Sequence, residues 1–233
     1  MYKYVKRIFD IVFSLIGLIL LSPIFLVVAI WIKLESAGPI VIKQQRYGKN
    51  KKPFACLKFR TMYEDTPPNS PTNDLKNAHK YITPSGRFLR RSGLDELLQL
   101  INVLRGEMSL IGPRPVILAE KNLIAKRDNY NANAVKPGIG GWAQSNGRDE
   151  LDDETKARLD GEYVQNLGIR MDISCIWRTF IAVFTSDGFR EGKIGDTPYK
   201  KEVQQNTKRI TLKERASRKI TKKREKSEIA EHA

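Results

Sequence analysis

The amino-acid sequence predicts an α+β protein that is mostly helical and is attached to a membrane at its N-terminal end. Residues 11–32 form a nearly uncharged apolar run, long enough to cross a bilayer as one helix. Two short runs with the composition of strands, 40–46 and 53–60, flank a turn at 48–50. In most of the segments that follow, apolar residues recur at helical spacing. We therefore expect a membrane-embedded helix, a β-hairpin and a mainly helical domain.

Two features of the apolar run argue against a simple transmembrane span. Ser22 and Pro23 lie at its centre, where the proline removes a helical hydrogen bond and the serine hydroxyl can satisfy the freed carbonyl and deepen the bend. Basic residues flank the run on both sides, and basic flanks stay in the cytoplasm. We expect a re-entrant helix that enters the membrane, breaks at Ser22 and Pro23, and returns to the same face; a single kinked span is the alternative. The flanking basic residues are Lys3, Lys6, Arg7, Lys33 and Lys43.

The composition restricts the partners of the chain. Its 233 residues carry a formal net charge of +15, which favours phosphorylated substrates, an anionic membrane surface or nucleic acid as partners. The two cysteines, Cys56 and Cys175, form no C-x-x-C pair, and the chain has only two histidines. Neither a disulfide framework nor a zinc site is therefore expected.

The adjacent acids Asp95 and Glu96 stand near the start of a segment that reads as a helix over residues 92–105. Ser92 is suited to cap this helix, with Asp95 three residues later, and Gly106 is suited to end it. Apolar residues recur at helical spacing, namely Leu94, Leu97, Leu98, Ile101 and Leu104. Taken alone, this pattern indicates that Asp95 caps a helix and that Glu96 faces water, because acids are common in first turns.

Arginines around the acid pair favour a second interpretation. Arg90 lies just before the acids, and Arg114 follows them in the rigid turn Gly112-Pro113-Arg114-Pro115. Carboxylates beside guanidinium groups suit an anionic substrate held with a divalent metal, because magnesium bridges carboxylates and phosphates.

The block at 95–115 closely resembles the signature of the bacterial polyprenyl-phosphate phosphoglycosyl transferases of the small monotopic kind, also called bacterial sugar transferases. That family carries an Asp-Glu dyad in a D-E-L-P-Q-L-x-N-V-L-x-G-x-M-S-x-x-G-P-R-P block, which this chain matches except at Leu98. The K-F-R-T-M segment at 58–62 is similar to the family's as well, as is a glycine-rich loop at 136–148. That loop is either a ligand contact or a structural turn, and Lys136 and Gly140 depart from the family's arginine and threonine. The resemblance covers roughly residues 1–190.

The resemblance implies an enzyme at the cytoplasmic face of a bacterial inner membrane. Such an enzyme moves a phosphosugar from a UDP-sugar to polyprenyl (undecaprenyl) phosphate, releases UMP, and initiates an exopolysaccharide, capsule or glycoprotein glycan. Asp95 would be the nucleophile that forms a covalent phosphosugar intermediate, and Asp95 and Glu96 would hold Mg²⁺. The basic residues that would bind substrate phosphates are Arg90, Arg114, Lys58 and Arg148.

The same resemblance implies a re-entrant membrane helix at 1–36 and a catalytic sugar transferase domain at 37–190, and the composition adds a third part, a basic tail at 191–233. Within the domain, the patterns predict helices over 83–91, 116–130 and 149–167, a loop at 65–82, and an amphipathic helix at 173–184 that lies in the membrane interface. The tail is rich in lysine and arginine and poor in apolar residues, so we expect it to be disordered or loosely helical on anionic lipid.

A membrane-tethered module without catalytic activity is the competing interpretation, with a basic surface that binds anionic lipid or nucleic acid. It does not account for the paired acids, because carboxylates repel a polyanion. Nucleic acid is therefore not expected as a partner. A homodimer is left open, and no residue identifies the sugar.

Overall fold

The computed structural model describes residues 2–66, 80–147 and 151–185. Contacts divide the chain into two units, Met1–Ile194 and Gly195–Ala233, and every described residue belongs to the first. The tail predicted at 191–233 lies outside the described residues, and the three-part division stays a prediction. The helices are α1 (Tyr2–Glu35), α2 (Pro84–Ser92), α3 (Gln99–Arg105), α4 (Lys121–Asn129), α5 (Trp142–Ser145), α6 (Asp153–Gln165) and α7 (Ile169–Thr185), and the strands are β1 (Val41–Tyr47), β2 (Pro53–Phe59), β3 (Ser109–Ile111), β4 (Val116–Ile117) and β5 (Gly138–Gly140).

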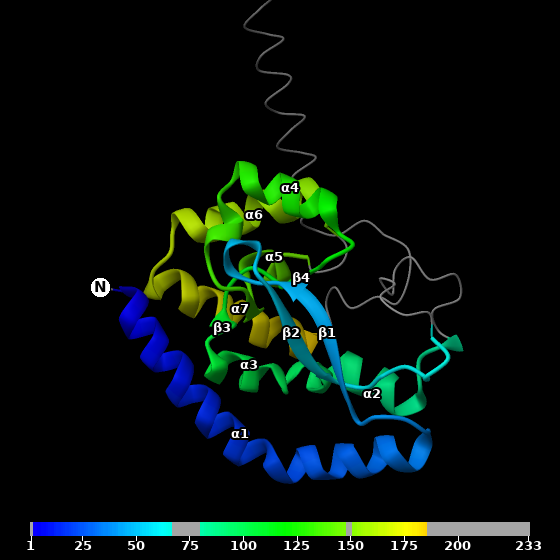
Figure 1. Cartoon of the computed structure of the whole chain (residues 1–233). Coiled ribbons are helices and arrows are strands. Elements are labelled where there is room, and N and C mark those ends of the chain that lie inside the picture. The colour runs from blue at the N-terminus through cyan, green and yellow to red at the C-terminus, as the bar shows by residue number, and fades with distance from the viewer. Residues whose placement is uncertain (1, 67–79, 148–150, 186–233) are drawn as a thin grey trace, which may run out of the picture. The chain divides into compact units, whose positions relative to one another are not determined.

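Helix α1 continues through Pro23, where a break was expected, and bends near its middle (Figure 1). Proline has no N–H to donate to the carbonyl of Ile19, four residues earlier. The hydroxyl of Ser22 donates to that carbonyl instead, with an O–O distance of 2.8 Å. The helix therefore changes direction while this carbonyl keeps a donor, and its re-entrant course in a membrane stays a prediction.

One face of α1 packs against α2, α3 and β3, and the opposite face is apolar and exposed. The buried side chains of α1 lie four residues apart in two pairs, Asp10 with Ser14 and Val28 with Ile32. Among the residues that the structure describes, α1 is the one helix long and apolar enough to cross a membrane. Because so large an apolar face is unfavourable in water, hydrocarbon is the environment that suits it.

The strands form two small sheets that carry the site. β1 pairs antiparallel with β2, as the hairpin prediction required, and β4 joins the other edge of β1. β3 and β5 pair in parallel. The predicted helix at 116–130 is wrong at its start, because Val116 and Ile117 pair with Tyr47 and Arg46 of β1, and α4 begins only at Lys121. The predictions of helices at 83–91 and 149–167 are confirmed by α2 and α6.

A buried cluster joins the membrane helix to the elements that carry the acid pair. Its members are Val28 and Ile32 of α1, Leu57 and Phe59 of β2, Leu89 of α2, and Leu98 before α3. These apolar contacts hold the backbone around Asp95 and Glu96 in place, since closely packed interiors allow little movement.

Helix α7 presents a second exposed apolar face. Its exposed side chains recur at helical spacing and are Ile169, Ile173, Ile176, Trp177 and Ile181. The helix predicted at 173–184 is present, within longer bounds, and its place in a membrane interface remains a prediction.

Candidate active site

Asp95 and Glu96 lie on a 3₁₀ turn, η4 (Leu94–Glu96), between α2 and α3. The prediction that Ser92 caps a helix over 92–105 is wrong: Ser92 is the last residue of α2, and its hydroxyl donates to the carbonyls of Phe88 and Leu89. Gly93 then takes the left-handed conformation, with φ 72°, which ends α2 and re-aims the chain. No side chain caps η4, so the acid pair is not explained by capping.

Glu96 is held by two cations from distant parts of the chain. Nζ of Lys58, on β2, lies 2.7 Å from Oε1 of Glu96. The guanidinium of Arg114, in the turn between β3 and β4, approaches both carboxylate oxygens, with Nη2–Oε1 at 2.9 Å and Nη1–Oε2 at 3.3 Å. Burial alone would raise the pKa of Glu96, but Arg114 and Lys58 overcome it and hold this pKa well below its ordinary value. Glu96 is therefore ionised at neutral pH, and it holds Lys58 and Arg114 in place.

Asp95 differs from Glu96 in its hydrogen bonds and in the direction of its pKa shift. Its side chain is buried, and the described residues donate no hydrogen bond to its carboxyl group. Burial raises its pKa to about 6, against the lowering effect of Lys58, with smaller contributions from Glu96, which raises it, and from Arg90 and Arg114. At neutral pH it is a mainly ionised, poorly solvated carboxylate that accepts no hydrogen bond within the described ranges, and such a group suits nucleophilic attack.

The structure brings together some of the predicted cationic residues and not others. Lys58 and Arg114 both contact Glu96, and the side chain of Arg114 remains 39% exposed. Arg90, on α2, donates from Nε to the hydroxyl of Thr61 at 2.8 Å and acts on Asp95 through its charge. Arg148 lies outside the described residues.

The glycine-rich loop packs directly behind the turn that carries Arg114. The backbone N–H of Gly138 donates to the carbonyl of Pro113, and that of Gly112 donates to the carbonyl of Gly140, at 2.9 and 2.8 Å. A Cβ placed on Gly138 would lie 2.0 Å from the nitrogen of Gly112, and one on Gly141 would lie 2.2 Å from its oxygen. Glycine is needed at Gly138 and Gly141 because the backbone of the loop lies against the backbone of the Arg114 turn. This favours the interpretation of the loop as a structural turn over that of a ligand contact.

The comparison with known families agrees with this geometry. A family model described as "Bacterial sugar transferase" matches residues 1–186. The chain belongs to the bacterial sugar transferase family. The resemblance inferred from the 95–115 block is thereby confirmed.

This sugar transferase has curated relatives of two lengths. It is 37% identical over 186 residues to "Uncharacterized sugar transferase EpsL" of Bacillus subtilis strain 168, covering 80% of this chain and 90% of that protein. It is 36% identical over 198 residues to "Exopolysaccharide production protein ExoY" of Sinorhizobium fredii, covering 78% and 87%. It is 38% identical over 191 residues to the "UDP-glucose:undecaprenyl-phosphate glucose-1-phosphate transferase" of Escherichia coli K12, covering 79% and 41%. The chain thus spans most of the first two relatives and less than half of the third.

Two arginines that position the Arg114 turn of the sugar transferase escaped the sequence analysis. Arg46, on β1, is buried and donates to the carbonyl of Pro115 and to the side chain of Gln44. Arg127, on α4, donates to the carbonyl of Arg114 at 3.0 Å. Only the spacing of strands and helices in the fold reveals these contacts. In the sequence, Arg46 is one of many cations in the hairpin, and Arg127 lies on a helix of mixed polarity.

The acid pair of the sugar transferase fits magnesium in one restricted way. The described residues contain no group of three acidic, histidine or cysteine side chains that could enclose a metal ion. Magnesium in phosphoryl-transfer sites is instead held by one or two carboxylates together with substrate phosphates. The carboxylate of Asp95 has oxygens available for this, whereas Oε1 of Glu96 already faces Lys58 and Arg114. The donor set suits an ion shared with the substrate, with Asp95 as the main ligand from the protein.

Proposed function

We propose that this sugar transferase moves a sugar phosphate from a UDP-sugar to undecaprenyl phosphate at the cytoplasmic face of the bacterial inner membrane, with release of UMP. The observation that carries the proposal is Asp95, a buried carboxylate to which no described residue donates a hydrogen bond, set beside the ion pairs of Glu96. The names of the relatives support the acceptor, since several are undecaprenyl-phosphate sugar phosphotransferases, and one is named for UDP-glucose. Two further relatives are named for exopolysaccharide production, which supports a role in that synthesis.

The proposed reaction has two displacement steps at one phosphorus atom. One carboxylate oxygen of Asp95 attacks the phosphorus that carries the sugar, and the bond from this phosphorus to the bridging oxygen breaks, so that UMP leaves with the bonding electrons. An oxygen of undecaprenyl phosphate then attacks the same phosphorus and releases the Asp95 carboxylate. Arg114, exposed on one side, binds phosphate oxygens, and Lys58 adds positive charge nearby. A bound Mg²⁺ would offset the charge that develops on the diphosphate.

The contacts of α1 support a re-entrant course at the membrane. Near its N-terminal end, Arg7 donates to the carbonyls of Val103 and Leu104, at 2.6 and 2.9 Å. Near its C-terminal end, Glu35 accepts a bond from the backbone N–H of Ser85 at 3.1 Å. Since both ends are tied to the same unit, that unit and both ends of α1 would lie on one side of the membrane. The exposed apolar faces of α1 and α7 would then meet lipid.

A non-catalytic module that binds polyanions is the weaker candidate. In the described part of the chain, the two cations nearest the acid pair are neutralised in part by Glu96, which lowers their attraction for a polyanion. Asp95 would repel such a ligand further. Both features serve a covalent displacement and neither serves simple polyanion binding.

The test is to trap the covalent intermediate. Purified protein in detergent is incubated with magnesium and a panel of UDP-sugars labelled in the sugar, without lipid acceptor. We expect label to stay on the protein, to depend on magnesium, to be released by hydroxylamine as acyl phosphates are, and to be absent from an Asp95→Asn variant. Failure to label with any UDP-sugar, while transfer to undecaprenyl phosphate proceeds, would exclude the covalent route. Absence of UMP release under all conditions would overturn the proposed function itself.

A further inference from the structure

A buried ion pair lies behind the turn that presents Arg114. Nε and Nη2 of Arg127 donate to Oδ2 of Asp160, on α6, at 2.8 and 2.5 Å. The third donor in use, Nη1, reaches the backbone carbonyl of Arg114 at 3.0 Å. Arg127 is 5% exposed and Asp160 is 1% exposed. One planar guanidinium therefore links α6 to the backbone of the residue whose own guanidinium holds Glu96.

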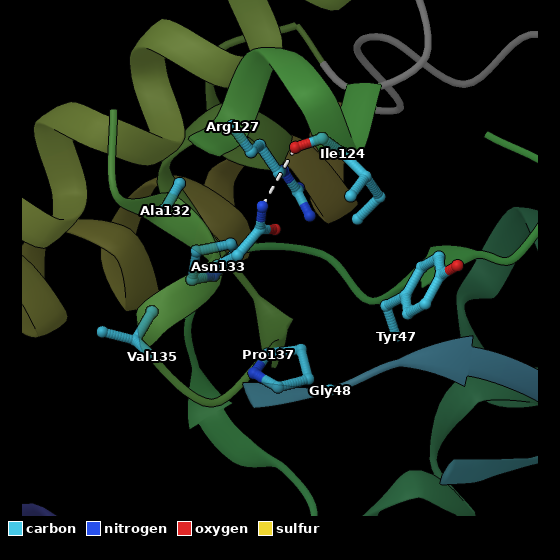
Figure 2. A pocket seen from close by; sticks show the side chains of 9 residues that line it. Tyr47, Gly48, Ile124, Arg127, Ala132, Asn133, Val135 and Pro137 are labelled. Carbon is cyan, nitrogen blue, oxygen red and sulfur yellow. Dashed lines mark hydrogen bonds between the residues drawn. The ribbon is translucent and has the colours of Figure 1, made fainter. Parts of the chain in front are cut away.

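The surroundings of Arg127 show how its side chain is directed. Figure 2 shows a narrow crevice beside α4, with the side chain of Arg127 next to Asn133. The amide of Asn133 donates to the carbonyl of Ile124 at 3.0 Å, which closes α4 against the following turn. Pro113, in the Arg114 turn, and Pro137 also line the crevice. The guanidinium is held by its bonds to Asp160 and to the carbonyl of Arg114.

Stability alone is a poor explanation for this pair. Removing two charges from water is expensive, and a buried ion pair regains that free energy only when every remaining polar atom is satisfied. Oδ1 of Asp160 is buried and has no hydrogen-bond partner in the described structure. An apolar pair of the same volume would serve packing as well, but it would supply no donor to the carbonyl of Arg114.

We propose that Arg127, oriented by Asp160, is a positioning residue that fixes the Arg114 turn so that the Arg114 guanidinium stays on Glu96. The inference rests on the proposed function and extends it to a pair of residues that do not touch the acid pair. The Arg114 guanidinium lies 3.3 and 2.9 Å from the two carboxylate oxygens of Glu96. If the turn loosens, this guanidinium leaves its fixed place beside the acid pair and binds the substrate diphosphate less well.

Substrate affinity reports this position. Arg114 binds phosphate oxygens in the proposed reaction, so a displaced guanidinium weakens both the binding of the UDP-sugar and its turnover. In Arg127→Met we expect the KM for the UDP-sugar to rise by about 5- to 10-fold and kcat at pH 8 to fall by about 10- to 100-fold.

Asp160→Asn separates positioning from a direct effect of charge. Removing a positive charge at Arg127 would by itself weaken the binding of the anionic UDP-sugar, and removing a negative charge at Asp160 would by itself strengthen it. If the pair acts by holding Arg114, both variants loosen the turn and both raise the KM for the UDP-sugar. Changes of KM in opposite directions would show a plain electrostatic effect and overturn the proposal.

Lys6→Met is the matched control for lost stability. It breaks another largely buried ion pair, with Asp172, that has the same N–O distance of 2.5 Å and does not include a residue of the Arg114 turn. We expect it to lower the unfolding temperature and to leave the KM for the UDP-sugar unchanged. If Arg127→Met gives too little folded protein, Asp160→Asn and Arg127→Lys carry the test, since a lysine keeps the charge but loses the planar fork.

The outcomes distinguish this inference from the proposed function. Wild-type transfer from UDP-glucose or another UDP-sugar to undecaprenyl phosphate must be present before the variants are compared. Its absence would count against the function. Normal transfer in the wild type, together with unchanged KM and kcat in the folded variants at Arg127 and Asp160, would overturn the positioning role alone.

Discussion

Replacing Asp95 with asparagine separates the reactivity of this carboxyl group from its effect on stability. Burial raises the pKa of Asp95 to about 6, against 3.8 for an ordinary aspartate. Since the unfolded chain has the ordinary pKa, keeping Asp95 ionised in the folded protein costs on the order of 2–3 kcal/mol at pH 8, at about 1.36 kcal/mol for each pH unit of difference.

The sign of the pH dependence follows from proton binding. Between about pH 4 and pH 6 the folded state binds more protons at Asp95 than the unfolded state, so this group lowers the stability of the protein as the pH rises through that window. Asparagine does not titrate. The Asp95→Asn protein should therefore be more stable than the wild type at pH 8 by about 1–2 kcal/mol, after allowance for a buried amide without partners, and the difference should disappear near pH 4.

The Asp95→Asn change should lower turnover, although it raises stability at pH 8. An amide cannot form the acyl phosphate, so we expect kcat to fall by at least about 10³-fold while the fold is retained. Denaturant midpoints of both proteins in detergent at pH 4, 6 and 8, with transfer assays on the same samples, measure the two effects. An Asp95→Asn protein that is less stable than the wild type at pH 8, or one that turns over normally, would refute the reasoning.

Glu96→Gln is the matched control on the neighbouring residue, and its sign is reversed. Arg114 and Lys58 hold the pKa of Glu96 well below its ordinary value despite burial. The stability that this ion pairing contributes is present above the ordinary pKa of glutamate and is lost as the pH falls through the lowered one. Glu96→Gln should therefore destabilise the protein at pH 8, because two cations lose their common partner.

Three further predictions concern the membrane, the tail and the glycine-rich loop. Cysteines placed at Lys3 and Lys43 should both resist labelling from the periplasmic side of intact cells, and labelling of only one of them would establish a true span. Pro23→Ala restores a helical N–H, and if it converts α1 into a span, the cysteine at position 3 should become labelled. Truncation after Pro198 should leave transfer in detergent largely intact, because the tail sequence has no apolar periodicity to pack, and loss of the folded protein would contradict this. Gly138→Ala should reduce folded yield sharply, because its Cβ would lie 2.0 Å from the nitrogen of Gly112, and a normal unfolding midpoint would show that the backbones can separate.

Local sequence patterns predicted those elements whose cause is local. The apolar run became α1, and the hydroxyl of Ser22 takes the role at Pro23 that the dipeptide suggested. The two runs with the composition of strands, on either side of the turn at 48–50, correctly predicted the β1–β2 hairpin. The start of α4 was misplaced because Val116 and Ile117 are drawn into the sheet by Tyr47 and Arg46, some 70 residues earlier, and a helical reading of the segment has no access to that pairing.

The site was predicted as far as one continuous block of sequence allows. The acids and Arg114 lie in that block, and Lys58 came from a second short motif. The 3₁₀ turn was missed because Gly93 looks like an early helical residue until its left-handed φ is known. Arg127 was missed because its role depends on α4 packing against α6, where Asp160 lies, and no spacing in the sequence encodes that contact.

The different environments of Asp95 and Glu96 follow from the turn on which they lie. In a 3₁₀ turn successive side chains point about 120° apart, and here the two adjacent acids meet different surroundings. The longer side chain of Glu96 reaches Lys58 and Arg114, and its pKa lies well below the ordinary value. The shorter side chain of Asp95 is buried, accepts no hydrogen bond from the described residues, and feels the same cations through their charge. A regular helix beginning at Ser92 would have placed both acids in a first turn, where backbone N–H groups would donate to them and lower their reactivity. The left-handed conformation of Gly93 prevents this. Glu96 is thereby left to pair with the cations, and Asp95 is left to act as the nucleophile that we propose.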